Sequence, residues 1–169
     1  MTLEEFLAVH SFVFERYEHP AVMTVAEAES LVPQLPGAKT KNLFLRDKKG
    51  LKYFLVTIPA ALSVNLKQLG DVLGAGRLSF ASADRLLTNL GVTPGSVTLL
   101  GLVNDLENKV QFVIDQALWD APAVQAHPLI NTATMVVLHA DLIRFLAVTG
   151  HAPQIISVPA VAPEDSALG

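Results

Sequence analysis

The sequence predicts a single domain of the mixed α/β (α+β) class, with a mainly antiparallel sheet flanked by short helices. Pairs of short apolar runs separated by turn residues are typical of antiparallel strands, and segments of helical periodicity interrupt them. A chain of 169 residues also has the length of one domain and can bury a core without a disulfide or metal staple. We therefore expect one domain over residues 1–159 and a disordered tail over residues 160–169, where periodicity ends.

The N-terminal part is predicted to hold two helices. In residues 3–17 the apolar side chains fall near helical spacing, and Pro20 disfavours helix at the residue before it, so we expect the first helix to end near His19. The pattern Thr24-Val-Ala-Glu27 is a capping box, in which each side chain can bind a backbone amide at the start of a helix. It predicts a short helix over residues 25–31, which the following prolines close.

A β-hairpin is predicted within residues 35–59. Two apolar runs, Leu43–Leu45 and Tyr53–Ile58, flank the turn Asp47-Lys-Lys-Gly50. The segment also holds six of the twelve Lys and Arg residues of a chain whose net charge is −4. These six are Lys39, Lys41, Arg46, Lys48, Lys49 and Lys52. The hairpin is therefore the first candidate for a surface that binds anions.

Helices and strands alternate along the rest of the chain. Three segments of helical periodicity end near a glycine and are predicted helices: residues 65–73, 83–90 and 140–148. Five extended runs are predicted strands: residues 77–80, 97–103, 110–114, 132–138 and 154–158. The Asn and Asp residues of segment 104–108 favour a hairpin between the second and third of these strands. The last strand is expected at an edge of the sheet.

Composition excludes or disfavours several classes of protein. The chain has no cysteine, which rules out a disulfide scaffold, a cysteine-ligated zinc site and a cysteine nucleophile. The five histidines are scattered, and nucleotide-binding, zinc-protease and serine-hydrolase motifs are missing, so we expect no metal and no cofactor. No apolar run approaches the ~20 residues of a membrane span, and the acidic N-terminus is no secretory signal, so we expect a cytoplasmic protein. A net charge of −4 argues against DNA and other sequence-blind nucleic-acid binding, but not against a local patch that holds one RNA end.

Three loops place polar groups beside predicted strands. Lys41, within Thr40-Lys41-Asn42, could bind a phosphate or polarise an ester carbonyl. The glycines of segment 91–96 let backbone amides approach an oxyanion, and His127 can act as an acid or base near neutral pH. Each loop also has an ordinary structural explanation: a surface lysine, a helix C-cap with a tight turn, and a histidine bonded to the backbone. Considered one at a time, the structural explanations are favoured.

The joint occurrence of four motifs in one order is more specific. The motifs are Thr40-Lys41-Asn42-Leu-Phe-Leu, Gly76-Arg77-Leu78-Ser79-Phe80-Ala-Ser82, Gly91-Val-Thr-Pro94-Gly95-Ser96-Val97 and His127-Pro128-Leu129-Ile-Asn131-Thr132-Ala133-Thr134. Over residues 21–156 the chain thereby resembles the YbaK/prolyl-tRNA-synthetase-associated domain family, and it is similar to the free-standing editing proteins of the PrdX or ProXp-ala type. The resemblance implies a mixed, largely antiparallel α/β fold. It also implies metal-independent hydrolysis of the ester that joins a wrong amino acid to tRNA(Pro), with alanyl-tRNA(Pro) favoured.

The resemblance implies roles for individual residues. Lys41 matches the family's essential lysine and is the expected catalytic residue. The expected substrate-binding residues are Asn42, Gly91, Thr93, Pro94, Gly95, Ser96 and His127. With a tRNA substrate, the residues expected to contact phosphates are Lys39, Lys48, Lys49 and Arg77, with Arg144 as a further candidate. The expected partners are mischarged tRNA(Pro) and, transiently, prolyl-tRNA synthetase.

Alternatives remain open at this level. Leu99, Ala126 and Met135 depart from residues that are frequent in the family, and this affects the expected shape of the amino-acid pocket. Because alanine is smaller than proline, we expect exclusion of proline by size, but a cysteinyl- or seryl-tRNA deacylase of the same fold is an alternative. Two further alternatives are a non-catalytic nucleic-acid-binding module and a small-molecule hydrolase of unrelated class.

Overall fold

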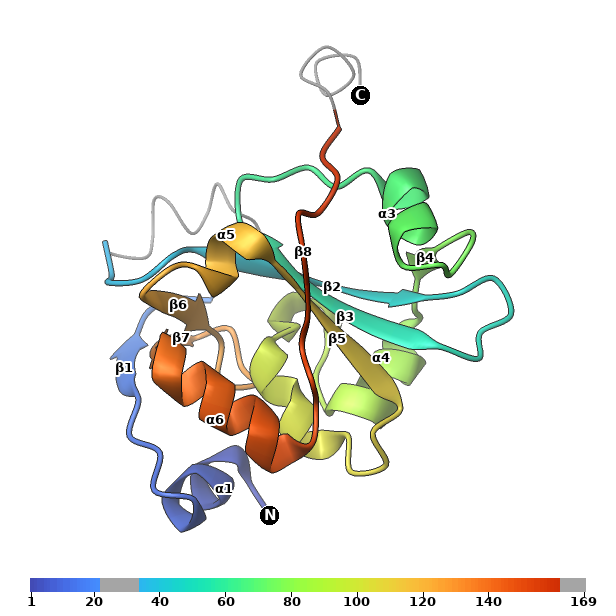
Figure 1. Ribbon diagram of the computed structural model, residues 1–169. Helices are drawn as coiled ribbons and strands as arrows, with labels where there is room; N and C mark the ends of the chain where they lie inside the picture. Colours follow the sequence, from blue (N-terminus) through green and yellow to red (C-terminus); the bar gives the residue numbers. More distant parts are fainter. Residues whose placement is uncertain (22–33, 162–169) are drawn as a thin grey trace.

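The computed structural model describes residues 1–21 and 34–161, and their strands lie in two sheets (Figure 1). The larger sheet has the order β4-β2-β3-β5-β8 and the smaller one the order β1-β7-β6. The strands are β1 Glu15–Glu18, β2 Thr40–Arg46, β3 Tyr53–Pro59, β4 Ser79–Phe80, β5 Val110–Asp115, β6 Ala123–Ala126, β7 Ala133–Leu138 and β8 Gln154–Ile156. The helices are α1 Leu3–Val9, α3 Leu66–Val72, α4 Ala83–Leu90, α5 Gln116–Trp119 and α6 His139–Thr149, with the 3-10 helices η1 Pro94–Ser96 and η2 Leu99–Asn104. Antiparallel pairs predominate, and β5 runs parallel to β3 and β8, so the predicted mixed class is confirmed.

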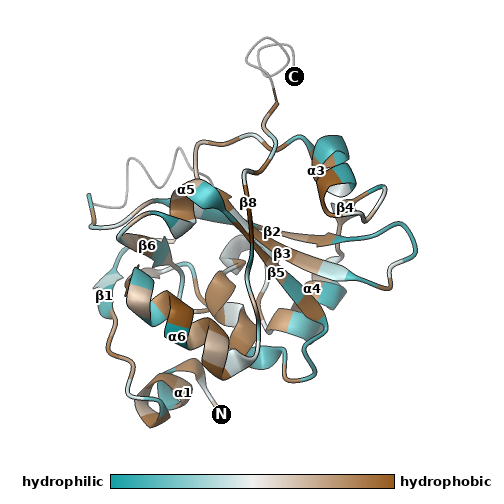
Figure 2. Cartoon of the chain, in the orientation of Figure 1, coloured by the Kyte–Doolittle hydropathy of each residue, from teal (hydrophilic) through white to brown (hydrophobic). Residues whose placement is uncertain are grey.

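The predicted hairpin forms the middle of the larger sheet. β2 and β3 are antiparallel over their whole length, and Asp47 Oδ1 closes the turn by accepting the amides of Leu51 and Lys52. All residues of the run 53–58 are buried, because β3 lies between two strands and has apolar groups on both of its faces. The hairpin turn is the hydrophilic end of this element (Figure 2).

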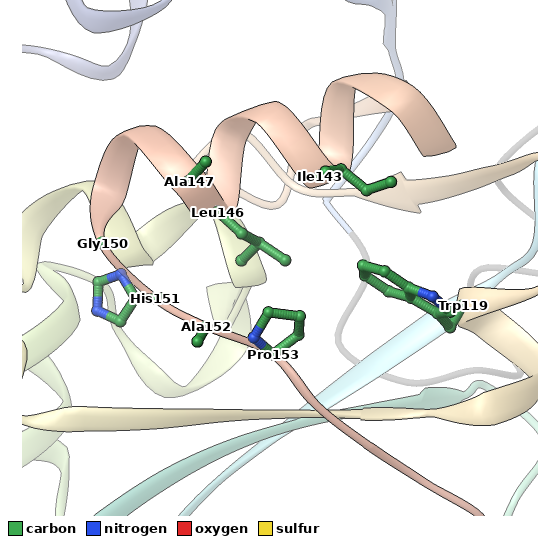
Figure 3. Close-up of a pocket in the computed structure, with 8 residues that line it drawn as sticks. All are labelled: Trp119, Ile143, Leu146, Ala147, Gly150, His151, Ala152 and Pro153. Atoms are coloured by element: carbon green, nitrogen blue, oxygen red, sulfur yellow. The ribbon is translucent and has the colours of Figure 1, made fainter.

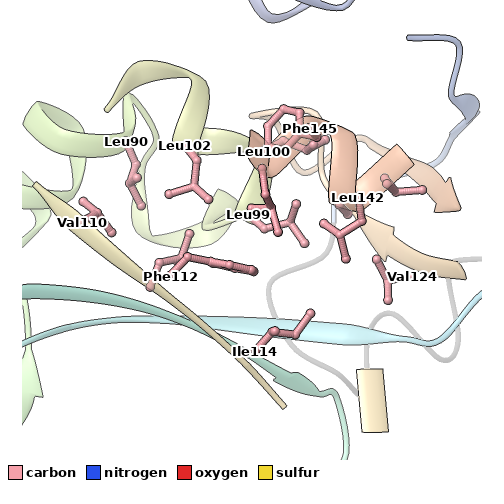
Figure 4. Close-up of a cluster of buried hydrophobic side chains, with 14 of the residues drawn as sticks. Leu90, Leu99, Leu100, Leu102, Val110, Phe112, Ile114, Val124, Leu142 and Phe145 are labelled. Carbon is pink, nitrogen blue, oxygen red and sulfur yellow. The ribbon is translucent and has the colours of Figure 1, made fainter. Parts of the chain in front are cut away.

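Buried apolar side chains form two groups, one on each face of the larger sheet. The first core group fills the space between this sheet, η2, α6 and the smaller sheet, and it includes Phe112 (Figure 4). The second core group contains Leu69 of α3 together with Val56. Successive residues of a strand point to opposite faces, so Phe44 belongs to the first core group and Leu45 to the second. The same alternation determines the face on which each polar residue of β2 lies.

The first helix is shorter than predicted. α1 ends at Val9, not near His19, and Ser11 has a left-handed backbone with φ 57° that a helix does not accommodate. Phe12 and Phe14 then pack against the first core group, and the chain continues into β1, which pairs with β7. The prediction was wrong because the apolar residues after Val9 fit a helical spacing as well as an extended chain, and strand pairing favours the latter.

The predicted second hairpin is also wrong. Residues 99–104 form η2, and β5 pairs in parallel with β3 instead of folding back on the run before it. The Thr98 hydroxyl accepts the amide of Leu100 and so begins the 3-10 helix. Leu99, Leu100 and Leu102 are buried, so this apolar run forms a buried helix, which periodicity alone does not distinguish from a strand.

The other elements lie within two residues of their predicted positions, and β8 is an edge strand as expected. Strand β6 and the short helix α5 were not predicted. The helix predicted over residues 25–31 lies outside the described residues, as does the tail from residue 162 onward. Val161, the last described residue, donates its amide to Ser63 O. No helix in the described part of the chain is long and apolar enough to cross a membrane.

Candidate active site

An opening in the sheet edge lies at the start of β2. Just before β2, Ala38 forms a parallel bridge with Val124 of β6, and the Thr40 hydroxyl donates to Gln125 O at 2.6 Å. Strand β6 makes no further backbone pairing with β2 beyond this bridge. Strand β4 pairs with the same edge of β2, but only from Leu45 onward. Among the described residues, the stretch of edge in between has no strand partner. Such an edge presents backbone donors and acceptors to a ligand.

His127 lies at this opening because it directly follows β6. The contact farthest along the two chains is the bond from Thr40 Oγ1 to Gln125 O; Lys41 follows Thr40 directly, and His127 follows Gln125 by two residues. Two hydrogen bonds hold the histidine: its carbonyl accepts Thr98 Oγ1 at 2.7 Å, and its Nδ1 lies 3.0 Å from Ala133 O. A carbonyl oxygen can only accept, so the hydrogen-bond network assigns the proton to Nδ1 and leaves Nε2 of the neutral ring as an acceptor.

His19, which the sequence did not single out, supports the His127 segment. Its amide donates to Thr132 O at 3.0 Å, and its Nε2 lies 2.8 Å from Thr134 Oγ1. The centres of the His19 and His127 rings are 6.3 Å apart. Burial lowers the pKa of His127 below its ordinary value of 6.5, the hydrogen bond to the Ala133 carbonyl partly offsets this, and His19 adds to the lowering. At neutral pH the His127 ring is therefore neutral.

The glycine–proline loop, residues 91–96, leads to the opening through Thr98, which follows it. Gly91 is the left-handed C-cap of α4 with φ 69°, and a Cβ there would lie 2.5 Å from Asn104 Nδ2, so Gly91 has a structural role. The loop continues as η1, in which the buried Ser96 donates its amide to Thr93 O. Two residues later Thr98 binds the His127 carbonyl. The structure thus brings the segment just after this loop and His127 together.

Lys41 and Asn42 leave β2 on opposite faces of the sheet. Lys41 pairs with Ile58 and shares the face of the second core group, whereas Asn42 pairs with Thr57 and shares the face of the first. Asn42 Oδ1 accepts the Thr57 hydroxyl at 2.6 Å. Lys41 is half-buried, and its ammonium has no hydrogen bond or ion pair with any described residue. Lys41 and Asn42 therefore approach the opening from different sides.

Comparison with known proteins settles the family. Residues 19–145 match the model of the aminoacyl-tRNA editing domain. The chain belongs to this family. It is 39% identical over 159 residues to prolyl-tRNA synthetase associated domain-containing protein 1 of Mus musculus, which covers 92% of this chain and 94% of that protein. It is 38% identical over 134 residues to the prolyl-tRNA editing protein ProX of Acetoanaerobium sticklandii, which covers 79% of this chain and 82% of that protein.

Solved structures share the fold of this editing domain. The structure of hypothetical protein APE2540 superimposes with a TM-score of 0.71 at 20% identity, over 92% of this chain and 97% of that one. A candidate trans-editing enzyme for prolyl tRNA synthetase superimposes with a TM-score of 0.69 at 21% identity, over 94% and 95%. The family that the four motifs predicted is confirmed.

The basic residues of the editing domain's hairpin fall into two groups. Lys39 lies at the opening, whereas Lys48 and Lys49 lie in the hairpin turn, roughly 20 Å from Lys41 at about 3.3 Å per residue of strand. Arg77 is exposed just before β4, which pairs with the turn end of β2. The length of a strand therefore separates the basic groups that lie close together in the sequence.

Arg144, the further candidate for a phosphate contact, is engaged within the protein. Its guanidinium donates to His10 O at 2.7 Å and lies 3.8 Å from the centre of the Phe12 ring. Arg144 therefore links α6 to the segment after α1 through these contacts.

The three residues that depart from the family pattern are all buried near the opening. Ala126 and Met135 are register partners in β6 and β7 and belong to the first core group, as does Leu99. Ala126 directly precedes His127, so a change of volume at this pair alters the space beside the histidine.

An apolar cavity of about 490 Å³ lies elsewhere, between α6, Trp119 and the chain that leads into β8 (Figure 3). It contains none of the predicted site residues. Its one titratable side chain, His151, has both ring nitrogens occupied, by Asp105 Oδ2 at 2.8 Å and by Thr149 Oγ1 at 2.9 Å. Within residues 1–21 and 34–161, no three His, Asp or Glu side chains gather as a metal site requires. We therefore place the candidate site at the opening.

Proposed function

We propose that this editing domain is a trans-editing deacylase that hydrolyses mischarged tRNA(Pro), with alanyl-tRNA(Pro) as its favoured substrate. The observation that supports the proposal most is the neutral His127 imidazole, with Nε2 as an acceptor, beside the unpaired edge of β2 that carries Lys41 and Asn42. The similarity to the prolyl-tRNA editing protein ProX supports the same class of substrate. The names of other relatives suggest transient contact with prolyl-tRNA synthetase.

The reaction requires little of the protein because an aminoacyl ester is already activated. A water oxygen attacks the carbonyl carbon, and the bond from that carbon to the ribose oxygen breaks. The ribose oxygen takes up the proton that the water loses, with the neighbouring ribose hydroxyl able to pass it on, and the products are the amino acid and tRNA. The protein then has to hold the 3′ end, stabilise the oxyanion and exclude the correct amino acid.

The residues at the opening and in the adjoining glycine–proline loop can divide these tasks. In the proposal Lys41 anchors the tRNA end through a phosphate or an ester oxygen. The amides of Thr93 and Gly95 have no backbone acceptor among the described residues and can support an oxyanion, whereas those of Gly91 and Ser96 are already bonded within the loop. The neutral Nε2 of His127 can accept a hydrogen bond from the α-ammonium group or from the attacking water.

Substrate selection in this proposal depends on size. A tight apolar pocket admits the alanyl group and excludes the prolyl group by steric clash, as in the second site of a double sieve. Ala126 directly precedes His127, and its register partner Met135 belongs to the same core group, so this buried pair is the candidate for the wall that sets the pocket size. Discrimination of one methylene in an apolar pocket is worth only ~1–3 kcal/mol, so glycyl, seryl and cysteinyl esters are expected to react more slowly but measurably.

A panel of aminoacyl-tRNA(Pro) species tests the proposed function. The release of free amino acid from alanyl-, glycyl-, seryl-, cysteinyl- and prolyl-tRNA(Pro) is measured with the purified protein and corrected for spontaneous hydrolysis. We expect the alanyl ester to react fastest and the prolyl ester to be spared. Faster release of cysteine or serine would establish the alternative substrate of the same chemistry. Binding of tRNA without release of any amino acid would contradict the proposal and support the alternative of a non-catalytic nucleic-acid-binding module.

Binding of tRNA is expected to weaken as salt rises, because the lysines of the hairpin turn contact phosphates. For the double variant K48A/K49A, the slope of log Kd against log salt concentration is expected to fall by about 1 for each lysine that contacts a phosphate. Arg16→Ala is the matched control, because Arg16 lies in the smaller sheet and its charge is already paired with Glu18 at 2.6 Å. An affinity that does not change between low and physiological salt would contradict the phosphate contacts.

A further inference from the structure

A buried hydroxyl interrupts the apolar run of β3. Thr57 is 0% exposed and lies between Val56 and Ile58, which are equally buried. Its hydroxyl donates to Asn42 Oδ1 at 2.6 Å, and the two residues are register partners across the hairpin. A buried hydroxyl needs a hydrogen-bond partner, whereas a valine of nearly the same shape needs none. The Thr57 hydroxyl is therefore explained by what it does to Asn42, and not by packing.

The hydrogen bond determines which end of the Asn42 carboxamide faces the opening. Oδ1 and Nδ2 are nearly identical in shape, so the partner has to distinguish them. Asn42 is the only partner of the Thr57 hydroxyl in the described part of the chain, and the hydroxyl hydrogen needs an acceptor, so Oδ1 turns toward Thr57. Nδ2 then points away from Thr57. It has no partner within residues 1–21 and 34–161 and is not one of their buried unpaired atoms, so a ligand can reach it.

The backbone of Asn42 supplies a second donor, on the edge of the sheet. In this strand the backbone N–H and C=O groups of alternate residues point away from β3. Those of Ala38 bond to β6, and Phe44 O accepts the amide of Ala81. The N–H of Asn42 belongs to the same row and falls on the stretch of edge without a strand partner among the described residues. Several N–H groups directed at one point are what a developing oxyanion requires.

We propose that Thr57 is a positioning residue for the deacylation. It holds the Asn42 carboxamide with its NH₂ group toward the ester, and Asn42 donates to the carbonyl oxygen as negative charge develops there. The inference rests on the proposed function and adds to it. Thr57 is too buried to touch the substrate and acts only through Asn42. Lys41, on the other face of β2, holds the tRNA end, so two adjacent residues have separate tasks.

A matched pair of variants tests the positioning role. Thr57→Val removes the hydroxyl and keeps the shape, whereas Thr57→Ser keeps the hydroxyl. With alanyl-tRNA(Pro), T57V is expected to lower kcat about tenfold with little change in KM, because the interaction is made mainly in the transition state. T57S is expected to restore kcat. T57V added to Asn42→Ala is expected to cost nothing beyond N42A alone. An unchanged kcat in T57V, or losses that add in the double variant, would overturn the inference.

A measurement without substrate separates this inference from the proposed function. The side-chain NH₂ resonances of Asn42 are observed by NMR and assigned by their loss in N42A. We expect T57V to shift them and to speed their exchange with water, while T57S leaves them close to the wild type. If the wild-type protein hydrolyses no aminoacyl-tRNA, the proposed function fails, and the NMR result still decides the orientation. If hydrolysis is normal and the resonances in T57V do not change, the positioning role alone fails.

Discussion

Lys41→Ala is expected to abolish deacylation of alanyl-tRNA(Pro), with a loss of about 10²-fold or more, and to leave the thermal unfolding midpoint close to the wild type. The expected loss follows from the proposed role of Lys41, because the variant lacks the cation that would hold the tRNA end at the unpaired edge of β2. The fold is expected to persist because the Lys41 ammonium has no partner among the described residues, so no buried polar group is left unpaired. Single-turnover release of alanine and thermal unfolding are the two measurements.

Lys48→Ala is the matched control for Lys41→Ala, since it removes the same charge from the other end of β2. It is expected to weaken tRNA binding and to leave single-turnover release at saturating protein unchanged. Lys41→Arg keeps the charge but changes its shape, and intermediate activity would assign the lysine to phosphate anchoring. Near-normal turnover in K41A would show that Lys41 is not needed for the reaction. Stabilisation of the oxyanion would then depend on Asn42 and the loop amides.

His127→Gln is expected to slow deacylation about 10²-fold at neutral pH and to remove the acid limb of the pH profile. In the wild type the lowered pKa of His127 is expected to place the midpoint of the acid limb below the ordinary value of 6.5, because Nε2 stops accepting when the ring gains a proton and a charge. The rate of alanine release, corrected for spontaneous hydrolysis, is measured across this range. An acid limb whose midpoint lies above pH 6.5 would contradict the assignment.

The same lowered pKa affects folding. Below about pH 6.5 the unfolded chain binds a proton at His127 more readily than the folded one, so the free energy of unfolding is expected to fall as the pH drops through this region. His127→Gln is expected to weaken that dependence. His10→Asn is the control for both experiments, because His10 follows α1 and its ring packs on Phe6, with 4.6 Å between ring centres.

Local chemistry predicted those elements of the fold that carry their own boundary signals. Ser82 and Gly91 cap α4 at both ends, and the prediction of this helix agrees with the structure to the residue. The apolar run 97–103 has no such signal, and it was interpreted as a strand because burial on all sides removes the periodicity that separates strand from helix. Strand β1 depends on pairing with β7, more than a hundred residues later, which no local pattern contains.

The candidate site was predictable in its residue types and not in its geometry. Motif order indicated Lys41, Asn42 and His127, and the structure adds that the first two lie on opposite faces of one strand. The support of His127 by His19 was missed because the bond from His19 to Thr134 spans 115 residues. Such contacts depend on how the two sheets meet, which one sequence does not show.

The hairpin that separates the two basic groups has a consequence for substrate length. Its strands are paired over seven residues and β3 is buried, so the span from Lys41 to the turn is rigid and cannot adapt to a ligand. If, as proposed, Lys41 holds the ester end and the lysines of the turn contact backbone phosphates, this stiff hairpin fixes the distance between the two contacts. An acceptor end that is one nucleotide too long or too short would make only one of the two contacts. The hairpin would therefore favour a single length of unpaired 3′ terminus without any contact to a base.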